Sequence, residues 1–205
     1  MIIKRKYKIC KRLGDGIFNK CQTPGFSRSI AVKKNSIKKR PPRARSEYGN
    51  QLVEKQRIRY TYLIKEGQFS NYVKRAENTK AVNSTEYLYK LLEKRLDNVI
   101  YRSGFAPSRA AARQLVSHGH IVVEGVKITV PSYELNIGDK IVIREGSKEK
   151  TIFKGLALKL KNHKVPKWLK LWPETYLVEV LGEPSMLDLD STLNLNSVME
   201  FYSRT

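Results

Sequence analysis

The stretch APSRAAARQLVSHGHIVVEGVKI, residues 106–128, decides the fold of this chain. Ser108 is a suitable N-cap for a helix whose apolar side chains recur at helical spacing, and Gly119 suits the C-terminal end of that helix. The following IVVEGVKI has the pattern of two strands joined by a two-residue turn at Glu124 and Gly125. The stretch therefore predicts a short helix that runs into a β-hairpin.

The helix and the hairpin of this stretch should present basic side chains together. Arg109 and Arg113 are four residues apart, so they project from one side of the helix. A two-residue turn places Val123 opposite Val126 on the apolar face of the hairpin and Lys127 on the other face. We therefore expect a small apolar core beneath a basic rim.

Helical patterns precede this stretch and strand patterns follow it. The sequence predicts a helix capped by Ser46, with Tyr48 and Leu52 facing inward and Lys55 facing outward. It also predicts an amphipathic helix around 69–76 and a helix with a capping box at Asn83, whose apolar stripe runs from Leu88 to Val99. KIVIRE at 140–145 and TYLVEVL at 175–181 have the pattern of strands. Together these patterns predict an α+β fold.

Composition and pattern divide the chain into four parts. Residues 1–45 contain repeated Gly and Pro, and we expect a basic N-terminal arm that orders against a charged partner. Residues 46–94 should form a helical domain, and residues 95–150 a small module of two helices and a hairpin or small sheet. Residues 151–205 form a mixed C-terminal segment, acidic after residue 170, which is expected to pack on the helical domain and complete it.

The C-terminal segment has features of its own. Trp168 and Trp172 stand at helical spacing and are expected to be core residues, and NSVMEFYSR should form a helix capped by Asn196 or Ser197. Acidic side chains cannot lie on phosphate without repulsion. The acidic end should therefore face a protein or fold back onto the chain's own basic surface.

The chain carries a large positive charge. Forty Lys and Arg residues oppose 19 Asp and Glu residues, which leaves a net charge of +21. Residues 171–205 carry a net −5, so residues 1–170 carry +26. A polyanion relieves such self-repulsion, and nucleic acid is the leading partner. The alternatives are an anionic membrane surface, which the basic stretches fit less well because they lack a lipid-binding face, and a merely soluble basic surface.

Neither a membrane span nor a metal centre is expected. No apolar run approaches the roughly 20 residues that cross a bilayer. The only cysteines are Cys10 and Cys21, whereas a structural zinc site needs about four Cys or His ligands in paired spacing. We therefore expect no metal and no other cofactor. Two reduced thiols are the default, since no secretory signal accompanies them, although a disulfide is geometrically possible.

The segment SRAAARQLVSHGHIVVEG resembles the S-four RNA-binding module. The module pattern has Ser-Arg-x-x-Ala, then Leu-Val, then a Gly before a strand–Gly hairpin. Further segments, including SEYGNQLVEKQRIRYTY, LLEKRLDNVIYRSGF, VPSYELNIGDKIVIRE, PKWL and MEFYS, occur in the order typical of the S-four family of small-subunit ribosomal proteins. The matched module residues are Ser108, Arg109, Ala112, Leu115, Val116, Gly119 and Gly125.

The resemblance implies a structural ribosomal protein and not an enzyme. Members of this kind bind small-subunit ribosomal RNA near a helix junction of its 5′ domain and assemble early. The resemblance also implies a position where messenger RNA enters the subunit, contact with the neighbouring S-five protein, and an influence on decoding accuracy. The place of action would be the ribosome, in the bacterial cytoplasm or in an organellar matrix or stroma.

The chain departs from the family pattern in three places. Many members carry a four-cysteine zinc cluster near the N-terminus, whereas this chain keeps Cys10 and Cys21 alone. The segment RPPRARSEYG replaces the usual Pro-Gly-Gln-His-Gly before the first helix. Glu124 stands at the hairpin turn where Asn is typical, and Glu tolerates a positive φ less well than Asn.

The candidate RNA-contacting residues come from four parts of the chain. The charged candidates on the helices have a plainer interpretation as solvated surface charge, and His118 could instead cover a helix end. Asp97 is interpreted as part of an internal ion pair with Lys94 and Arg95. The candidates are Ser108, Arg109, Arg113, His118 and Lys127 in the module; Arg95 and Arg102 before it; Lys55, Arg57 and Arg59 in the first predicted helix; and Lys38, Lys39, Arg40, Arg43 and Arg45 in the arm.

Two other functions compete with a ribosomal role. An RNA-modifying enzyme such as a pseudouridine synthase can carry the same module, but it needs a catalytic carboxylate in a cleft. A DNA-binding helix-turn-helix protein is suggested by the two helices around SGFAPS at 103–108. The sequence has no Gly-rich phosphate loop and no catalytic Ser/His/Asp or Cys/His set, which favours the non-enzymatic alternative.

Overall fold

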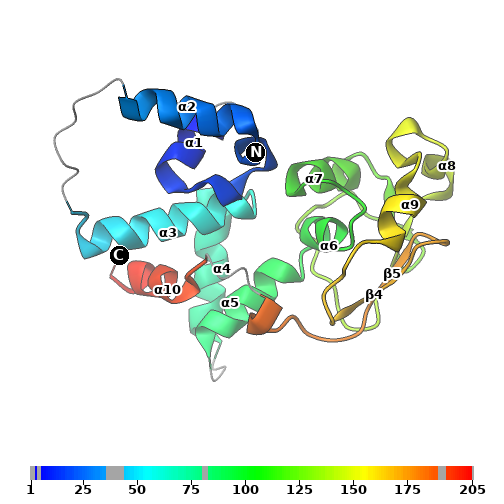
Figure 1. The fold of residues 1–205 in the computed structure, drawn as a ribbon. Helices are drawn as coiled ribbons and strands as arrows, with labels where there is room; N and C mark the ends of the chain where they lie inside the picture. Colours follow the sequence, from blue (N-terminus) through cyan, green and yellow to red (C-terminus); the bar gives the residue numbers. More distant parts are fainter. Residues whose placement is uncertain (1–2, 4–5, 36–43, 80–82, 189–192, 205) are drawn as a thin grey trace. The chain divides into compact units, whose positions relative to one another are not determined.

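The computed structural model describes residues 3, 6–35, 44–79, 83–188 and 193–204. The chain forms two compact units, Met1–Asn78 with Asp190–Thr205, and Thr79–Leu189. Figure 1 shows the helices of the first unit and the mixed α and β structure of the second. The α+β fold that the sequence predicts is therefore confirmed. None of the described helices is long and apolar enough to cross a bilayer.

The N-terminal segment contains regular structure. Its elements are α1 (Lys6–Leu13), the 3-10 turns η1 (Asp15–Ile17) and η2 (Asn19–Gln22), and α2 (Pro24–Asn35). A small apolar core lies between them, made of Cys10, Cys21 and Phe26 with Ile17, Phe18 and Ile30 packed against it. The expectation of an arm without a packed core is therefore wrong for residues 6–35, because a few apolar side chains spaced between the Gly and Pro residues meet in one cluster.

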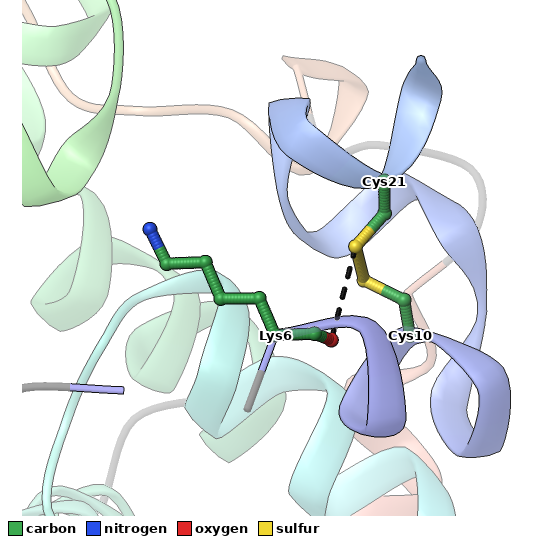
Figure 2. Close-up of a disulfide and its surroundings, with 3 residues drawn as sticks. All are labelled: Lys6, Cys10 and Cys21. Atoms are coloured by element: carbon green, nitrogen blue, oxygen red, sulfur yellow. Dashed lines mark hydrogen bonds between the residues drawn. A yellow bond between two sulfur atoms is a disulfide. The ribbon is translucent and has the colours of Figure 1, made fainter. Parts of the chain in front are cut away.

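The two cysteines of this core form a disulfide (Figure 2). Their Cα atoms are 6.5 Å apart, and the residues are 2% and 1% exposed. The bond joins α1 to η2, and Cys21 Sγ lies 3.8 Å from the carbonyl oxygen of Lys6. The expectation of two reduced thiols is thus wrong in this structure, since burial in one cluster brings the sulfurs together. Across the described residues, no three Cys, His, Asp or Glu side chains converge as metal ligands.

Three further helices complete the described part of the first unit: α3 (Glu47–Thr61), α4 (Glu66–Asn78) and α10 (Leu195–Ser203). Ser46 caps α3 as predicted, with its hydroxyl accepting a hydrogen bond from Gly49 N at 3.2 Å. The predicted stripe of α4 is buried as well. The C-terminal α10 lies along α3 (Figure 1). Its cap is Asn194 and not Asn196 or Ser197, because the Asn194 side chain accepts from Ser197 N at 3.1 Å.

The buried face of α3 differs from the predicted one. Tyr48 was expected inside but is 52% exposed, whereas Gln51 and Lys55 are buried. Gln51 donates to Glu200 at 3.0 Å and Lys55 donates to Glu66 at 2.7 Å, so the amide nitrogen of Gln51 and the ammonium group of Lys55 each have a partner. Tertiary pairing overrides the hydrophobic pattern here, because a satisfied polar group can be buried at little cost.

The second unit begins with α5 (Ser84–Glu93), α6 (Leu96–Arg102) and α7 (Arg109–Ser117). Asn83 and Ser108 cap α5 and α7 as predicted. The sequence favours one continuous apolar stripe from Leu88 to Val99, but the helix breaks at Arg95, which is extended. The break arises because this segment bonds to another part of the chain: Leu96 N donates to Tyr133 O at 2.8 Å.

Five antiparallel strands form one sheet in the order β2-β1-β3-β5-β4. Glu124 and Gly125 have φ values of 47° and 78°, which are those of a primed hairpin turn, and Val123 pairs with Val126 as predicted. Glu124 tolerates its positive φ because its carboxylate and its N–H both bond to the backbone of Lys140. The strands are β1 (Ile121–Val123), β2 (Val126–Lys127), β3 (Lys140–Ile143), β4 (Leu169–Trp172) and β5 (Leu177–Val180).

Short helices connect β3 to β4: α8 (Glu145–Lys148), η3 (Thr151–Phe153) and α9 (Leu156–Lys161). The 3-10 turn η4 (Met186–Asp188) follows β5. Trp168 lies in the core of the second unit as expected, while Trp172 is half-buried and belongs to a strand, not a helix. Residues 151–189 belong to this second unit because β5 pairs directly with β3. The compact units therefore divide the chain after residues 78 and 189, whereas the predicted boundaries lie after residues 94 and 150.

Candidate nucleic-acid interface

A polar network that joins α5, α6 and α7 holds Arg109, the first of the two predicted arginines of α7. Glu93 is completely buried and accepts two hydrogen bonds from Arg102, both at 3.0 Å. The Asn98 amide donates to Glu93 at 2.8 Å, and its oxygen accepts from Arg109 Nε at 2.7 Å. The Arg109 guanidinium also lies 4.5 Å from the centre of the Tyr101 ring. Arg109 is therefore held in one orientation before any ligand arrives.

A second ion pair lies beneath Arg113. The predicted internal pair of Asp97 is confirmed for Arg95, with N–O distances of 3.0 and 2.7 Å. Arg113 Nη1 stands 3.8 Å from Asp97 Oδ2, and its side chain is 24% exposed. Arg95 is completely buried, so it cannot reach RNA and is corrected from a candidate contact to a structural residue.

Arg109 and Arg113 therefore stand at the surface on one side of α7, as the sequence predicts. Both residues are partly exposed. Ser108 serves mainly as the cap, since its hydroxyl accepts from Ala111 N at 3.3 Å. Arg102 is the structural partner of Glu93, although its side chain keeps an exposed fraction of 16%. Fixed guanidinium groups are suited to phosphate, because their planar fork can contact two oxygens.

Four basic residues surround the C-terminal end of α7 and are called the basic edge: His118, Lys127, Arg144 and Lys150. All four are exposed. Arg144 N donates to His120 O at 2.9 Å, which brings the end of β3 beside the end of α7. The stem of Lys127 passes across Gly119, where a Cβ atom would collide with it. Strand pairing thus assembles one cationic surface from residues distant in sequence.

Buried His120 lies beneath the basic edge. Its Nδ1 is 2.9 Å from Ser147 Oγ, and its ring meets Phe153 edge-on at 5.9 Å between centroids. Burial lowers the pKa of His120 below its ordinary value, and the positive charges of Lys150, His118, Arg144 and Lys127 lower this pKa further. The neutral ring supports the edge without adding charge to it.

Comparison with known proteins identifies the family. The model of the ribosomal protein S4/S9 N-terminal domain matches residues 2–93, and the S4 domain model matches residues 94–141. A small ribosomal subunit protein uS4 of Roseiflexus sp. (strain RS-1) is 43% identical over 203 residues, with 96% of each chain covered. This chain belongs to the uS4 family.

Other uS4 proteins are similarly close, and they are ribosomal proteins, not enzymes. The uS4 protein of Chloroflexus aurantiacus is 39% identical over 206 residues, again with 96% of each chain covered. That of Clostridium beijerinckii is 39% identical over 203 residues. The resemblance that the sequence motifs indicate is therefore confirmed along nearly the whole chain.

The cations on α3 of this uS4 chain are mostly structural. Lys55 pairs with Glu66 at 2.7 Å and lies 4.5 Å from the centre of the Phe201 ring. Its burial removes it from the candidate contacts, which corrects the prediction that it points outward. Burial raises the pKa of Glu66, but hydrogen bonds from Lys55 and Tyr202 outweigh this effect, so that the pKa of Glu66 lies below its ordinary value.

The other two α3 cations also have partners within the chain. Arg57 bonds to Glu54 at 2.7 Å and donates to Leu13 O at 2.8 Å, so it ties the N-terminal segment to α3. Arg59 pairs with Glu66 at 3.4 Å and stacks on Tyr60 with 4.8 Å to the ring centroid. Their structural contacts weaken the case for Arg57 and Arg59 as RNA contacts.

The predicted arm residues are only partly described. Arg45 is exposed, just before α3. Lys38, Lys39, Arg40 and Arg43 lie outside the described residues. Their role in this uS4 chain therefore stays a prediction from charge.

One residue of the acidic C-terminal segment, Glu183, pairs with the chain's own basic side chains, as one of the two expectations states. Glu183 accepts hydrogen bonds from Lys94 and Lys90 at 2.9 Å each. These bonds lower the pKa of Glu183 and raise that of Lys90. Lys90 and Lys94 are thereby engaged within the chain and do not belong to the interface.

Sequence reasoning did not single out Arg144 and Lys150. Arg144 ends the KIVIRE strand, and Lys150 follows in a polar loop, so neither has a local pattern of its own. The signal that could have found Arg144 is strand alternation. Ile141 and Ile143 face the core, and pairing of Ile143 with Ile121 brings the next residue to the end of α7.

Proposed function

We propose that this chain is a structural constituent of the small ribosomal subunit that binds small-subunit ribosomal RNA directly. The surface proposed for this contact joins Arg109 and Arg113 on α7 to the basic edge. The observation that carries the proposal is the presence of these cations on the second compact unit, which contains the segment matched by the S4 domain model, with Arg109 oriented by buried Glu93 through Asn98. A preoriented cationic surface binds phosphate without an additional ordering cost.

The mode of recognition follows from the chemistry of structured RNA. Its deep major groove excludes side chains, so proteins bind the phosphates, the 2′-hydroxyls and the overall shape. Guanidinium and ammonium groups supply the phosphate contacts that position the protein. We propose no base contact for Arg109, Arg113 or the basic edge, since phosphate contacts alone carry no sequence information.

The finer features of the proposal rest on the family resemblance. They are binding near a helix junction of the 5′ domain, early assembly, a position where messenger RNA enters, a neighbouring S-five protein, and an influence on decoding accuracy. The proposed place of action is the ribosome of a bacterial cytoplasm or of an organelle. The described structure offers no competing catalytic centre at Asp97, because that carboxylate is engaged by Arg95.

The test removes two positive charges from the basic edge and compares the effect on RNA affinity with that of removing two positive charges elsewhere. Arg144→Gln with Lys150→Gln removes two exposed cations from the edge, and Lys65→Gln with Lys74→Gln removes two exposed cations from the first unit. Affinity for the 5′ domain RNA should fall about tenfold or more for the edge variant, and at most about threefold for the matched control. Equal losses would contradict the proposed surface.

Two further measurements separate the competing functions. Duplex DNA should compete poorly against the 5′ domain RNA, whereas a preference for DNA would favour a helix-turn-helix role. Incubation with ribosomal RNA should leave every base unmodified, and base turnover would favour an RNA-modifying enzyme.

A further inference from the structure

The second unit has a surface cavity of about 600 Å³. Its walls come from 101–107 around the end of α6, from 159–166 at and after the end of α9, and from Asp188. The volume lies within the range of roughly 300–1,000 Å³ that is typical of small-ligand sites. The cavity is distinct from the basic edge, because none of the residues that line the cavity belongs to that edge.

One wall of the cavity is fixed by an interaction between Gly104 and His163. Gly104 has a φ of 82°, and a Cβ atom there would lie only 2.7 Å from Cδ2 of His163. The imidazole Nε2–H of His163 donates to the carbonyl oxygen of Arg102 at 2.9 Å. The glycine therefore lets the ring close against the backbone, and the hydrogen bond holds the ring as a cavity wall.

The charges around the cavity favour an anionic ligand. The charge of Arg102 is compensated by buried Glu93. Lys159 and Lys164 are exposed, and within the described part of the chain neither has an ion-pair partner. Among the described residues, Asp188 is the one acidic residue in the lining. The two ammonium groups, set against one carboxylate, give the described lining a net positive charge.

The lining also contains apolar surface that a simple phosphate site would not need. Tyr101, Val165 and Pro166 line the cavity together with the two lysines. An aromatic ring beside ammonium groups is the combination that proteins use for unpaired nucleotides, with the base on apolar surface and the phosphate on the cations. The Asp188 carboxylate repels a bare anion but can accept a hydrogen bond from the edge of a base.

We propose that this cavity receives one unpaired nucleotide of RNA, with its base against the apolar lining and its phosphates at Lys159 and Lys164. The inference rests on the proposed RNA-binding function and adds a site to it. Tyr101 connects the two, because its ring carries the Arg109 guanidinium at 4.5 Å and also lines the cavity. One RNA strand can thus bind Arg109 through phosphate and place a neighbouring base in the cavity.

The experiment measures binding of the full-length protein to single-stranded RNA of about 9 nucleotides. A second oligonucleotide has the same length and phosphates but lacks its central bases. The cavity variant is Lys159→Gln with Lys164→Gln. The matched control is Lys161→Gln with Lys167→Gln, which removes two exposed cations from the same segment outside the cavity lining.

We expect the cavity variant to bind the normal oligonucleotide about tenfold more weakly and the control at most about twofold more weakly. The wild-type protein should prefer the normal oligonucleotide over the base-lacking one, and the cavity variant should lose most of this preference. A loss that depends on the bases cannot come from net charge alone.

Three outcomes would overturn the inference. The first is an equal loss of affinity for the cavity and control variants, and the second is equal wild-type affinity for both oligonucleotides. The third is displacement of the oligonucleotide by a polyglutamate peptide from the wild-type protein but not from the variant that lacks Lys159 and Lys164. The last outcome would assign the cavity to an acidic protein. Binding of the 5′ domain RNA is measured in parallel. Normal binding there with no base-dependent effect rejects the cavity alone, whereas no binding of that RNA rejects the proposed function.

Discussion

The side chain of Lys127 crosses the face of Gly119, in the space that a Cβ atom on Gly119 would occupy. Gly119 also has a φ of 69°, which disfavours any residue with a Cβ. Lys127 on β2 is thereby placed against the end of α7. The glycine does more than end a helix, because it also positions one cation of the basic edge.

Gly119→Ala should destabilise the chain and displace the Lys127 side chain. The left-handed backbone costs about 1–2 kcal/mol for alanine. The collision adds little to this cost, because the atoms that would meet the Cβ belong to the end of an exposed, flexible side chain that can move aside. Urea unfolding measures the loss in the free energy of unfolding. Adding Lys127→Ala should leave most of the loss in place, and full recovery by the double variant would show that φ is unimportant.

Lys55→Met should lower stability without affecting RNA binding. The substitution removes Lys55 as a partner of Glu66, which keeps Arg59 and the Tyr202 hydroxyl, and it removes the cation above the Phe201 ring. Because the Glu66 side chain is 43% exposed and keeps these two partners, the expected loss in the free energy of unfolding is about 1 kcal/mol. The affinity of the folded protein for 5′ domain RNA should stay within about twofold. A tenfold weaker affinity at full stability would return Lys55 to the candidate contacts.

His120 should make stability depend on pH. Its pKa is lowered in the folded chain, first by burial and then by the neighbouring cations, so the unfolded chain binds the proton more readily. The free energy of unfolding should therefore decrease as the pH falls below about 6.5, the ordinary histidine pKa. Urea unfolding at about pH 8 and about pH 5 measures the difference. His120→Gln should reduce this pH dependence, and an unchanged dependence would contradict the assignment.

The Cys10–Cys21 disulfide should stabilise the N-terminal segment. Its two residues are 11 apart in sequence, and closing a loop of that size contributes about 2–3 kcal/mol. Cys10→Ser with Cys21→Ser should lower the unfolding temperature of the chain. Alkylation in urea, followed by intact mass measurement, should label both cysteines only after reduction. Labelling without reductant would show two thiols instead.

Local patterns were sufficient to predict much of the fold. Ser46, Asn83 and Ser108 were predicted as caps because each hydroxyl or amide acts on backbone groups two or three residues away. The register of β1 and β2 was also predicted from local sequence, because a two-residue turn fixes which residues of the two strands pair. Arg109 and Arg113 were placed together correctly, since helical spacing alone puts them on one side of α7.

The errors concern interactions between distant residues. Lys55 was placed outside because its partners, Glu66 and the C-terminal aromatic residues, come from other helices. The helix break at Arg95 depends on Tyr133, and the core around Cys10 and Cys21 depends on apolar residues scattered among glycines. Arg144 joins the basic edge only after β3 pairs with β1. No local periodicity encodes these contacts.

The most direct measurement is the salt dependence of binding to the 5′ domain of small-subunit ribosomal RNA. If the basic surface of the second unit and the N-terminal cations together neutralise about 8 phosphates, the slope of log affinity against log salt concentration should be about −6 to −7. Replacing Arg144 and Lys150 with Gln should make this slope shallower by about 1–2. A slope near zero, or an affinity for this RNA no higher than for duplex DNA of equal length, would contradict the account.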